Sequence, residues 1–195
     1  MARTVHERLD VIALVAEVFR ELGYHGASIG DITQRTGLSK GSLYHFFPGG
    51  KAQMAAEVLA HVDRWFITEI YEPLERGDTA SAIDDMWTSV DAYFRSGRRV
   101  CLVGAFALDE TRDLFAAAIH EYFRRWIAAL AKALRRAGAD RKSAQSVAEE
   151  VVAGIQGALV LARALGDEKV FRRNLSGLKR VVANCLEKPS RRTPS

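Results

Sequence analysis

The residues of this chain whose types could do chemistry are concentrated between Ser28 and Lys51. This stretch, SIGDITQRTGLSKGSLYHFFPGGK, mixes hydroxyl, ammonium, phenol and imidazole groups with glycines. Hydroxyls and free backbone N–H groups at helix starts hold phosphates, and a lysine in the first turn of a helix can reach a phosphate or a guanine edge. The chemistry that this stretch favours is contact with the phosphates and base edges of a nucleic acid duplex.

The candidate contact residues are small, hydroxylated or hydrogen-bonding. Gly41 and Ser42 lack bulk and would let the backbone approach the duplex, and Tyr44 and His45 can donate to phosphates. Ser28 and Lys51 stand at expected helix starts, where backbone N–H groups also favour phosphate. The full set that we expect to face DNA is Ser28, Ser39, Lys40, Gly41, Ser42, Tyr44, His45 and Lys51.

Two short helices must position these side chains. The first is expected at about residues 29 to 36, opened by a capping box of Ser28 with Asp31 and closed by Gly37. Ser39 would cap the second, which ends near residue 46 and turns Leu43 and two phenylalanines inward. This is a helix-turn-helix pattern, in which the second helix enters the major groove. The same pattern also occurs as a purely structural corner between two helices.

Charge alone does not decide between these alternatives. Residues 1–51 hold six basic and five acidic side chains, and the whole chain carries a formal net charge of +4 with a pI near 9.2. Such a balance permits nucleic acid binding without demanding it. Affinity for DNA would have to come from individually placed contacts and from two copies of the chain.

Composition excludes several classes of protein. The chain has 195 residues, 48% hydrophobic and 27% charged, which is typical of a folded globular protein. Its longest apolar runs have six residues, too few to span a membrane, and its charged start predicts no signal peptide. The two cysteines build no disulfide framework, and neither zinc-ligand spacing nor a catalytic motif occurs. We therefore expect a cytoplasmic protein with no cofactor, no metal and no enzymatic activity.

Elsewhere the apolar spacing is helical, with no sustained alternation of period two. Glycines fall where such helices would end, which predicts an all-α protein of about nine helices. The expected helices include residues 51–70, one that runs from about Leu114 to Gly138, 142–165 and 168–185. The domains would be a helix-turn-helix domain at 1–51, a ligand-binding and dimerisation domain at 52–187 and a disordered tail at 188–195.

The expected helix at 142–165 is apolar on more than one side, so more than one side should be covered. One cover could be a second subunit, giving a homodimer; in the alternative, both faces pack inside one chain. The predicted interface residues are Val151, Gly154, Ala158, Leu161, Leu165, Phe171, Leu175, Leu178 and Val182.

The middle helices are rich in large aromatic side chains, which suit either a packed core or an apolar pocket with a few polar groups. The pocket hypothesis places a small apolar or aromatic ligand among Trp87, Phe94, Phe106, Phe123, Trp126 and Gln156. Cys101 follows two arginines, which would lower the pKa of its thiol and permit a redox role. Its other interpretation is a small apolar residue at a helix start.

Several of these residues together resemble the TetR family of one-component transcriptional regulators. The resemblance rests on Phe19, Gly23-Tyr24, Ser28-Ile29, Ile32 and the run from Gly37 to Phe47. Ser28 stands where threonine is commoner in the family and keeps the hydroxyl. Phe46 stands where tyrosine or histidine is usual, so a phosphate contact from that position is either lost or not needed. Pro48-Gly49-Gly50-Lys51 and the segment from Cys101 to Glu110 are similar to the lincomycin-resistance-regulator-like subgroup, which is associated with multidrug-type efflux control.

The resemblance implies a homodimeric repressor that binds a palindromic DNA operator and releases it when an effector fills the C-terminal domain. The alternative is a helical lipid-binding or small-molecule-binding protein, or an enzyme, with an incidental helix-turn-helix corner. Such a protein would need convergent acid, base or metal-ligating residues, and the sequence shows none.

Overall fold

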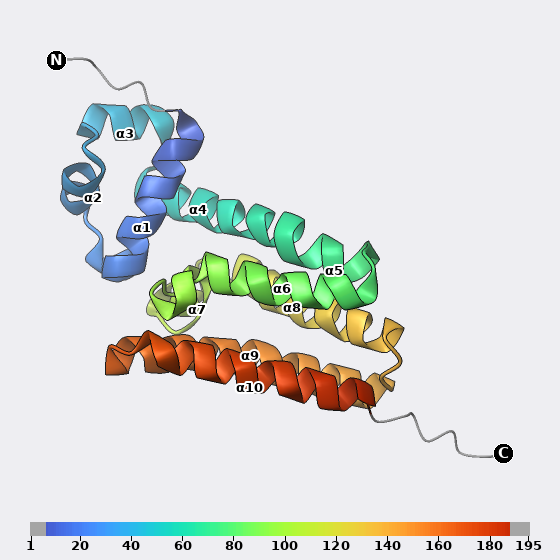
Figure 1. The fold of residues 1–195 in the computed structure, drawn as a ribbon. Helices are drawn as coiled ribbons and strands as arrows, with labels where there is room; N and C mark the ends of the chain where they lie inside the picture. The colour runs from blue at the N-terminus through green and yellow to red at the C-terminus, as the bar shows by residue number, and fades with distance from the viewer. Residues whose placement is uncertain (1–6, 188–195) are drawn as a thin grey trace. The chain divides into compact units, whose positions relative to one another are not determined.

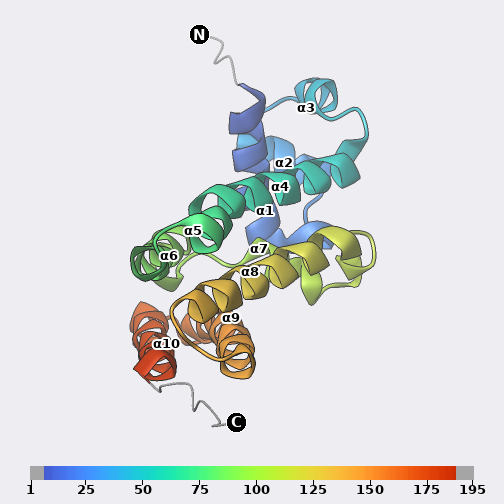
Figure 2. The ribbon, with the colours of Figure 1, turned by 90° about the vertical axis from the view of Figure 1, so that its right-hand side faces the viewer.

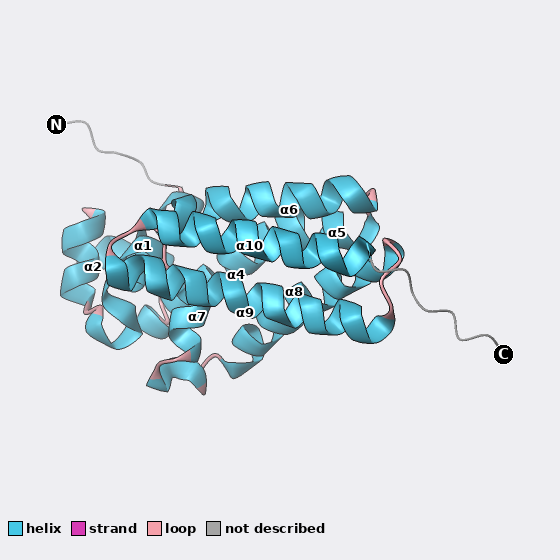
Figure 3. Cartoon of the chain, turned by 60° about the horizontal axis from the view of Figure 1, so that its bottom comes forward, coloured by secondary structure: helices cyan, strands magenta, loops and turns pink. Residues whose placement is uncertain are grey.

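The computed structural model describes residues 7–187, which form helices without a strand (Figures 1 and 3). The helices are α1 (Arg8–Gly26), α2 (Ile29–Thr36), α3 (Lys40–Phe46), α4 (Gly50–Phe66), α5 (Glu72–Arg76), α6 (Thr79–Tyr93), α7 (Leu102–Ala107), α8 (Ala116–Arg136), α9 (Arg141–Leu165) and α10 (Glu168–Glu187). Because α4 and α5 are joined without a break through a π-helical turn, this part of the chain holds nine helical rods. The all-α prediction of about nine helices is confirmed.

The chain divides into two compact units. The first contains the residues up to Arg64 together with Leu102–Ile119, and the second contains Trp65–Cys101 and the residues from His120 onward. Thus α7 joins the first unit, although it lies in the sequence within the expected ligand-binding domain. The functional boundary after residue 51 stays a prediction, and the expected tail at 188–195 lies outside the described residues.

In the first unit, α1 supplies an apolar face on which α2 and α7 pack. Val11, Val15 and Phe19 are fully buried at a spacing of four residues, which places them on one side of the helix. This helix contacts α2 and α7, and α2 contacts α3. Figure 2 gives a second view of these helices, and α3 lies at one end of the unit in both views.

In the second unit, α9 and α10 lie side by side as a helical hairpin (Figure 3). Gly166, between them, has a left-handed conformation with φ 61°, which favours glycine because it has no Cβ. A Cβ on Gly154 of α9 would lie 2.7 Å from Cδ2 of Leu178 on α10. The two helices therefore approach each other closely because this position carries no side chain.

An aromatic cluster forms the core of the second unit. The Phe66 ring lies 5.0 Å from Tyr93, 4.8 Å from Tyr122 and 5.1 Å from Trp126, measured between ring centroids. The Tyr71 hydroxyl donates to the Tyr122 carbonyl oxygen at 3.0 Å, and both side chains are buried. Burial raises the pKa of the Tyr122 phenol well above 10, with a smaller contribution from the nearby Cys101 thiol, so it stays neutral.

Two helix boundaries differ from the sequence prediction. The helix expected at 51–70 widens at Ile67–Tyr71 into a π turn, where the Glu72 amide donates to the Ile67 carbonyl. Pro73 has no amide hydrogen and its ring would clash with the carbonyl four residues earlier, which disfavours a regular α-helix here. Leu114, expected on the long helix that ends at Gly138, precedes α8 and is exposed. None of the helices at residues 7–187 combines the length and the apolar character needed to cross a membrane.

Candidate nucleic-acid interface

The turn between α2 and α3 is fixed by local hydrogen bonds. Ser28 caps α2: its hydroxyl accepts from the Asp31 amide at 3.1 Å, and the Asp31 carboxylate accepts from the Ser28 amide at 3.0 Å. The predicted capping box is therefore confirmed. The same Ser28 hydroxyl and amide hold the pKa of Asp31 below its usual value. Gly37 ends α2 with φ 71°, and Leu38 is buried after it.

The two faces of α3 have opposite character. Leu43 and, directly after the helix, Phe47 are fully buried, and Phe46 is half-buried. Lys40, Gly41, Tyr44 and His45 are exposed, and Ser42 is half-buried. Figure 1 shows α2 and α3 joined by this short turn. The buried side chains orient the helix, so its polar residues share the solvent side.

The polar groups on α3 differ in how far they are already engaged. The Ser39 hydroxyl caps the helix by accepting from the Ser42 amide at 3.0 Å, and the two serine hydroxyls are 2.9 Å apart. Within the described part of the chain, the Lys40 ammonium has no hydrogen bond or ion pair. A Cβ on Gly41 would meet nothing nearer than the Ser39 hydroxyl at 3.8 Å. Lys40 and the surface at Gly41 are therefore open to a ligand.

The Lys51 side chain contacts its own chain, although its position at the start of α4 predicts a phosphate contact. Its ammonium donates to the Tyr24 carbonyl oxygen at 3.0 Å and lies 4.5 Å from the centroid of the Tyr24 ring. The side chain is half-buried. A phosphate contact from Lys51 would have to compete with these contacts within the chain.

Three residues that sequence reasoning missed connect α1, α3 and α4. Arg8 donates to the Phe46 carbonyl oxygen and forms an ion pair with Glu57, which also accepts from Gln53. Arg8 and Glu57 are 49 residues apart in the sequence. Each lies in a helix that carries several charged residues, and nothing in the sequence marks these two as a pair. No local signal in the sequence distinguishes them.

The predicted ligand-binding residues are not gathered in one place. Phe106 belongs to the first unit, where its ring lies 6.1 Å from both Phe19 and Tyr24. The other five belong to the second unit, where Trp87, Phe94 and Trp126 are buried and Phe123 and Gln156 are half-buried. Local spacing shows that Phe106 is a core aromatic, but it cannot show which core it enters.

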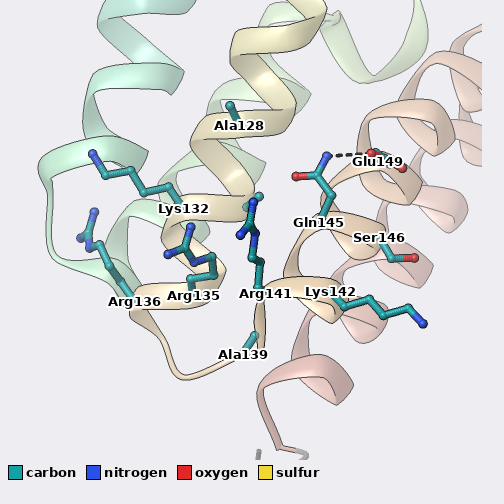
Figure 4. A pocket seen from close by; sticks show the side chains of 11 residues that line it. Ala128, Lys132, Arg135, Arg136, Ala139, Arg141, Lys142, Gln145, Ser146 and Glu149 are labelled. Carbon is teal, nitrogen blue, oxygen red and sulfur yellow. Dashed lines mark hydrogen bonds between the residues drawn. The ribbon is translucent and has the colours of Figure 1, made fainter.

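Two hollows lie on the second unit. An open groove of about 1050 Å³ between α8 and α9 contains none of the predicted ligand-binding residues (Figure 4). Arg135 and Arg141 point into it, and the Glu149 carboxylate accepts from Gln145. A smaller hollow of about 380 Å³ between α6 and α10 is lined by Trp87 and Asp91, among others. No group of three or more residues in the described ranges could hold a metal ion.

The predicted dimer residues fall into two sets. Leu161 and Leu165 on α9 are 48% and 66% exposed. The others are covered, or partly covered, within one chain: Val151, Ala158, Phe171, Leu175 and Val182 are buried, and Gly154 and Leu178 contact each other. The exposed apolar stripe on α9 therefore includes Leu161 and Leu165, whereas the other predicted interface residues are covered at least in part by their own chain.

Comparison with known proteins identifies both parts of the chain. Residues 12–58 match the family described as "Bacterial regulatory proteins, tetR family". Residues 79–175 match the family described as "Transcriptional regulator LmrA/YxaF-like, C-terminal domain". The two matches cover the helix-turn-helix and most of the second unit.

Similar proteins match this chain over most of their own length. The HTH-type transcriptional regulator LmrA of Bacillus subtilis is 27% identical over 80% of this chain and 85% of its own. An uncharacterized HTH-type regulator of Mycobacterium tuberculosis, Rv0196, is 30% identical over 83% and 85%. A TetR regulator from Legionella pneumophila shares the fold, with a TM-score of 0.72 at 21% identity over 92% of this chain and 97% of its own. The chain belongs to the TetR family of helix-turn-helix transcriptional regulators, which are not enzymes.

Proposed function

We propose that this regulator is a cytoplasmic, ligand-responsive repressor that binds a palindromic operator as a homodimer and leaves it when a small apolar or aromatic effector binds. The observation that carries the proposal is α3, which buries Leu43 and exposes Lys40, Gly41, Tyr44 and His45 on its other side. A helix held in this way can enter a major groove with its polar side chains toward the bases and phosphates.

Two copies are needed because one recognition helix offers few contacts. TetR regulators bind DNA and act as dimers. On α9, a stripe of exposed small and apolar residues supports the same arrangement here: Ala153, Gly157, Val160, Leu161, Ala164 and Leu165. Exposed apolar surface of this kind is typical of a protein interface. A dimer with twofold symmetry reads two half-sites related by the same symmetry, so the operator is palindromic.

Unsatisfied donors inside the second unit support an effector site. The indole Nε1 of Trp126 and the amide Nε2 of Gln156 are buried and have no acceptor among residues 7–187. A buried donor without an acceptor costs about 1–3 kcal/mol. An aromatic ligand with acceptor atoms would recover this cost while burying apolar surface worth roughly 25 cal/mol per Å².

Effector and operator are coupled through a shift between two forms of the dimer. The effector prefers the form in which the recognition helices are wrongly spaced for successive major grooves. A tenfold loss of operator affinity requires about 1.4 kcal/mol of differential binding. Helix α4 carries residues of both compact units, which makes it our candidate for transmitting the change. The controlled genes would include efflux or detoxification genes, in keeping with the subgroup resemblance.

The operator is tested by selecting bound sequences from a random DNA library with the wild-type protein. We expect enriched sequences with two inverted half-sites about one helical turn apart, bound by an even number of protomers in sedimentation experiments. Enrichment of single half-sites bound by one protomer would contradict the palindromic dimer.

The effector site is tested by linkage between its two ligands. A compound that releases DNA must bind more weakly in the presence of operator, by the same factor as it weakens operator binding. We expect such a compound to quench Trp126 in a variant that keeps only this tryptophan, and Gln156→Leu to weaken its binding. The proposed site would be contradicted by an inducer that leaves Trp126 fluorescence unchanged and binds Gln156→Leu with wild-type affinity.

A further inference from the structure

Arg8, in the first turn of α1, holds the C-terminal end of the recognition helix. Its Nη1 donates to the carbonyl oxygen of Phe46, the last residue of α3, at 2.7 Å. The same guanidinium lies 5.4 Å from the centroid of the Phe47 ring. The last four carbonyl oxygens of a helix have no amide donor within the helix. Arg8 supplies a donor to one of them.

A carboxylate on α4 fixes the direction of this arginine. Glu57 accepts from Nε of Arg8 at 3.1 Å and from Nη2 at 2.5 Å, which makes a bidentate (two-pronged) ion pair. Gln53, one turn earlier on α4, donates to Glu57 at 2.8 Å and accepts from the Gly49 amide at 2.7 Å. The contacts thus run from α1 to the end of α3, to α4, and back to the loop that joins α3 and α4.

We propose that Arg8 and Glu57 are positioning residues that set the orientation of α3 relative to α1 and α4. The inference rests on the proposed operator binding. With seven residues, α3 is too short to be stable alone, so its orientation depends on what holds its ends. Ser39 caps the first end. At the last end the Phe47 amide donates to the Leu43 carbonyl, and Arg8 adds a contact from outside the helix by donating to the Phe46 carbonyl. Glu57 keeps the guanidinium turned toward Phe46 instead of toward solvent.

The rival interpretation is that Arg8 itself contacts a DNA phosphate, since its side chain is 47% exposed. The two interpretations predict opposite changes in operator affinity when Glu57 is replaced. Glu57→Gln removes a negative charge from the DNA-binding unit, so simple electrostatics predicts tighter operator binding. Loss of the positioning contact predicts weaker binding. They also differ at Arg8, because lysine keeps the charge but cannot form the two-pronged pair.

The experiment measures operator affinity across salt concentrations for Glu57→Gln, Arg8→Lys and the double variant. We expect each single variant to weaken binding about tenfold, and the double variant to be little weaker than either, because both act through one contact. The slope of log affinity against log salt stays that of wild type, whereas loss of a phosphate contact lowers it by about 0.9.

Ala56→Lys is the matched control. The position is exposed and neighbours Glu57, and the substitution makes the same change in charge as Glu57→Gln. It should bind as tightly as wild type or more tightly.

A second readout needs no DNA and separates this proposal from operator binding itself. Amide hydrogen exchange in the free protein should accelerate at residues 43–50 in Glu57→Gln and Arg8→Lys, while residues 29–36 keep their protection. Tighter operator binding by Glu57→Gln, wild-type operator affinity of Arg8→Lys, or unchanged exchange at residues 43–50 would each overturn the proposal. If wild type binds no operator but exchange accelerates as expected, the positioning role stands and the proposed function fails.

Discussion

At the scale of single residues, Lys40 and Lys51 show how one side-chain type takes two roles. Both lie within one short stretch, and the sequence predicts that each can reach a phosphate. Lys40 is exposed and unengaged in the described chain, whereas the Lys51 ammonium binds the carbonyl and ring of Tyr24. An ammonium that already has an acceptor and an aromatic face gains less from a phosphate than a solvated one. The two lysines should therefore respond differently to substitution.

The proposed recognition role of α3 is tested by Lys40→Ala and Gly41→Val. Lys40→Ala should weaken operator binding and lower the salt slope by about 0.9, because one ammonium–phosphate contact is lost. Gly41→Val should block binding by its bulk while the protein stays folded, since the position has free space and needs no left-handed backbone. Gel-shift titrations at several salt concentrations give both quantities. Lys169→Ala, an equal charge change at an exposed position on α10, should leave the slope at its wild-type value.

Substitution of Lys51 tests its structural role. Lys51→Met keeps most of the side-chain length and removes the hydrogen bond to Tyr24 and the cation–π contact. We expect the free energy of unfolding in urea to fall by about 1 kcal/mol while the salt slope of operator binding stays constant. A lowered slope with unchanged stability would assign Lys51 to the DNA instead.

At the scale of elements, the helix starts are set by short polar side chains. Asp78 accepts from the Ser81 amide at the start of α6, and Asp140 accepts from the Lys142 and Ser143 amides at the start of α9. Both carboxylates have a lowered pKa, chiefly because of hydrogen bonds from Ser81 and from Ser143. These caps therefore stabilise α6 and α9 most when the aspartates are ionised.

The α9 cap makes stability depend on pH. Because the folded pKa of Asp140 is depressed, its contribution is present above the unfolded pKa near 4 and is lost as the pH falls through the folded value. Asp140→Asn keeps a capping oxygen without the charge. Between about pH 5 and 3, wild type should lose more unfolding free energy than this variant, measured in urea at fixed protein concentration. Asp84→Asn on the exposed side of α6 should follow wild type; equal slopes for all three proteins would argue against the cap's role.

At the scale of the whole molecule, the covered and uncovered sides of α9 decide where a partner can bind. Gly154 faces Leu178 of α10 in the same chain, whereas nothing lies within 4 Å of a Cβ placed on Gly157. Leu161, four residues after Gly157, is 48% exposed. A bulky residue at 154 would break the hairpin, so it cannot separate assembly from folding.

The dimer is therefore tested at the open side of α9. Leu161→Arg should give folded monomers of 21.6 kDa at micromolar concentration, because a charge replaces apolar surface at the interface. Operator affinity should fall by about 100-fold or more, since the second recognition helix is no longer tethered to the first. Light scattering and gel-shift titration measure the two effects. Thr88→Arg, exposed on α6, should remain a dimer. A monomeric wild type would refute the assembly.

The sequence by itself determined the parts of this protein that depend on neighbouring residues. The capping box of Ser28 with Asp31, the left-handed Gly37 and the bounds of α2 follow from the intrinsic preferences of a few adjacent residues. The division of α3 into a buried and an exposed side also follows, because helical spacing places Leu43 and Lys40 on different faces.

Only the tertiary structure decided which partner each of these faces meets. Apolar spacing marks Val151 and Leu161 alike, but the chain's own elements bury the first and leave the second exposed. Phe106 is a core aromatic by its type, and folding places it beside Phe19 in the first unit. The pairing of Arg8 with Glu57 joins residues far apart in the chain. Local preference acts over a few residues, whereas contacts between helices depend on how the whole chain folds back on itself.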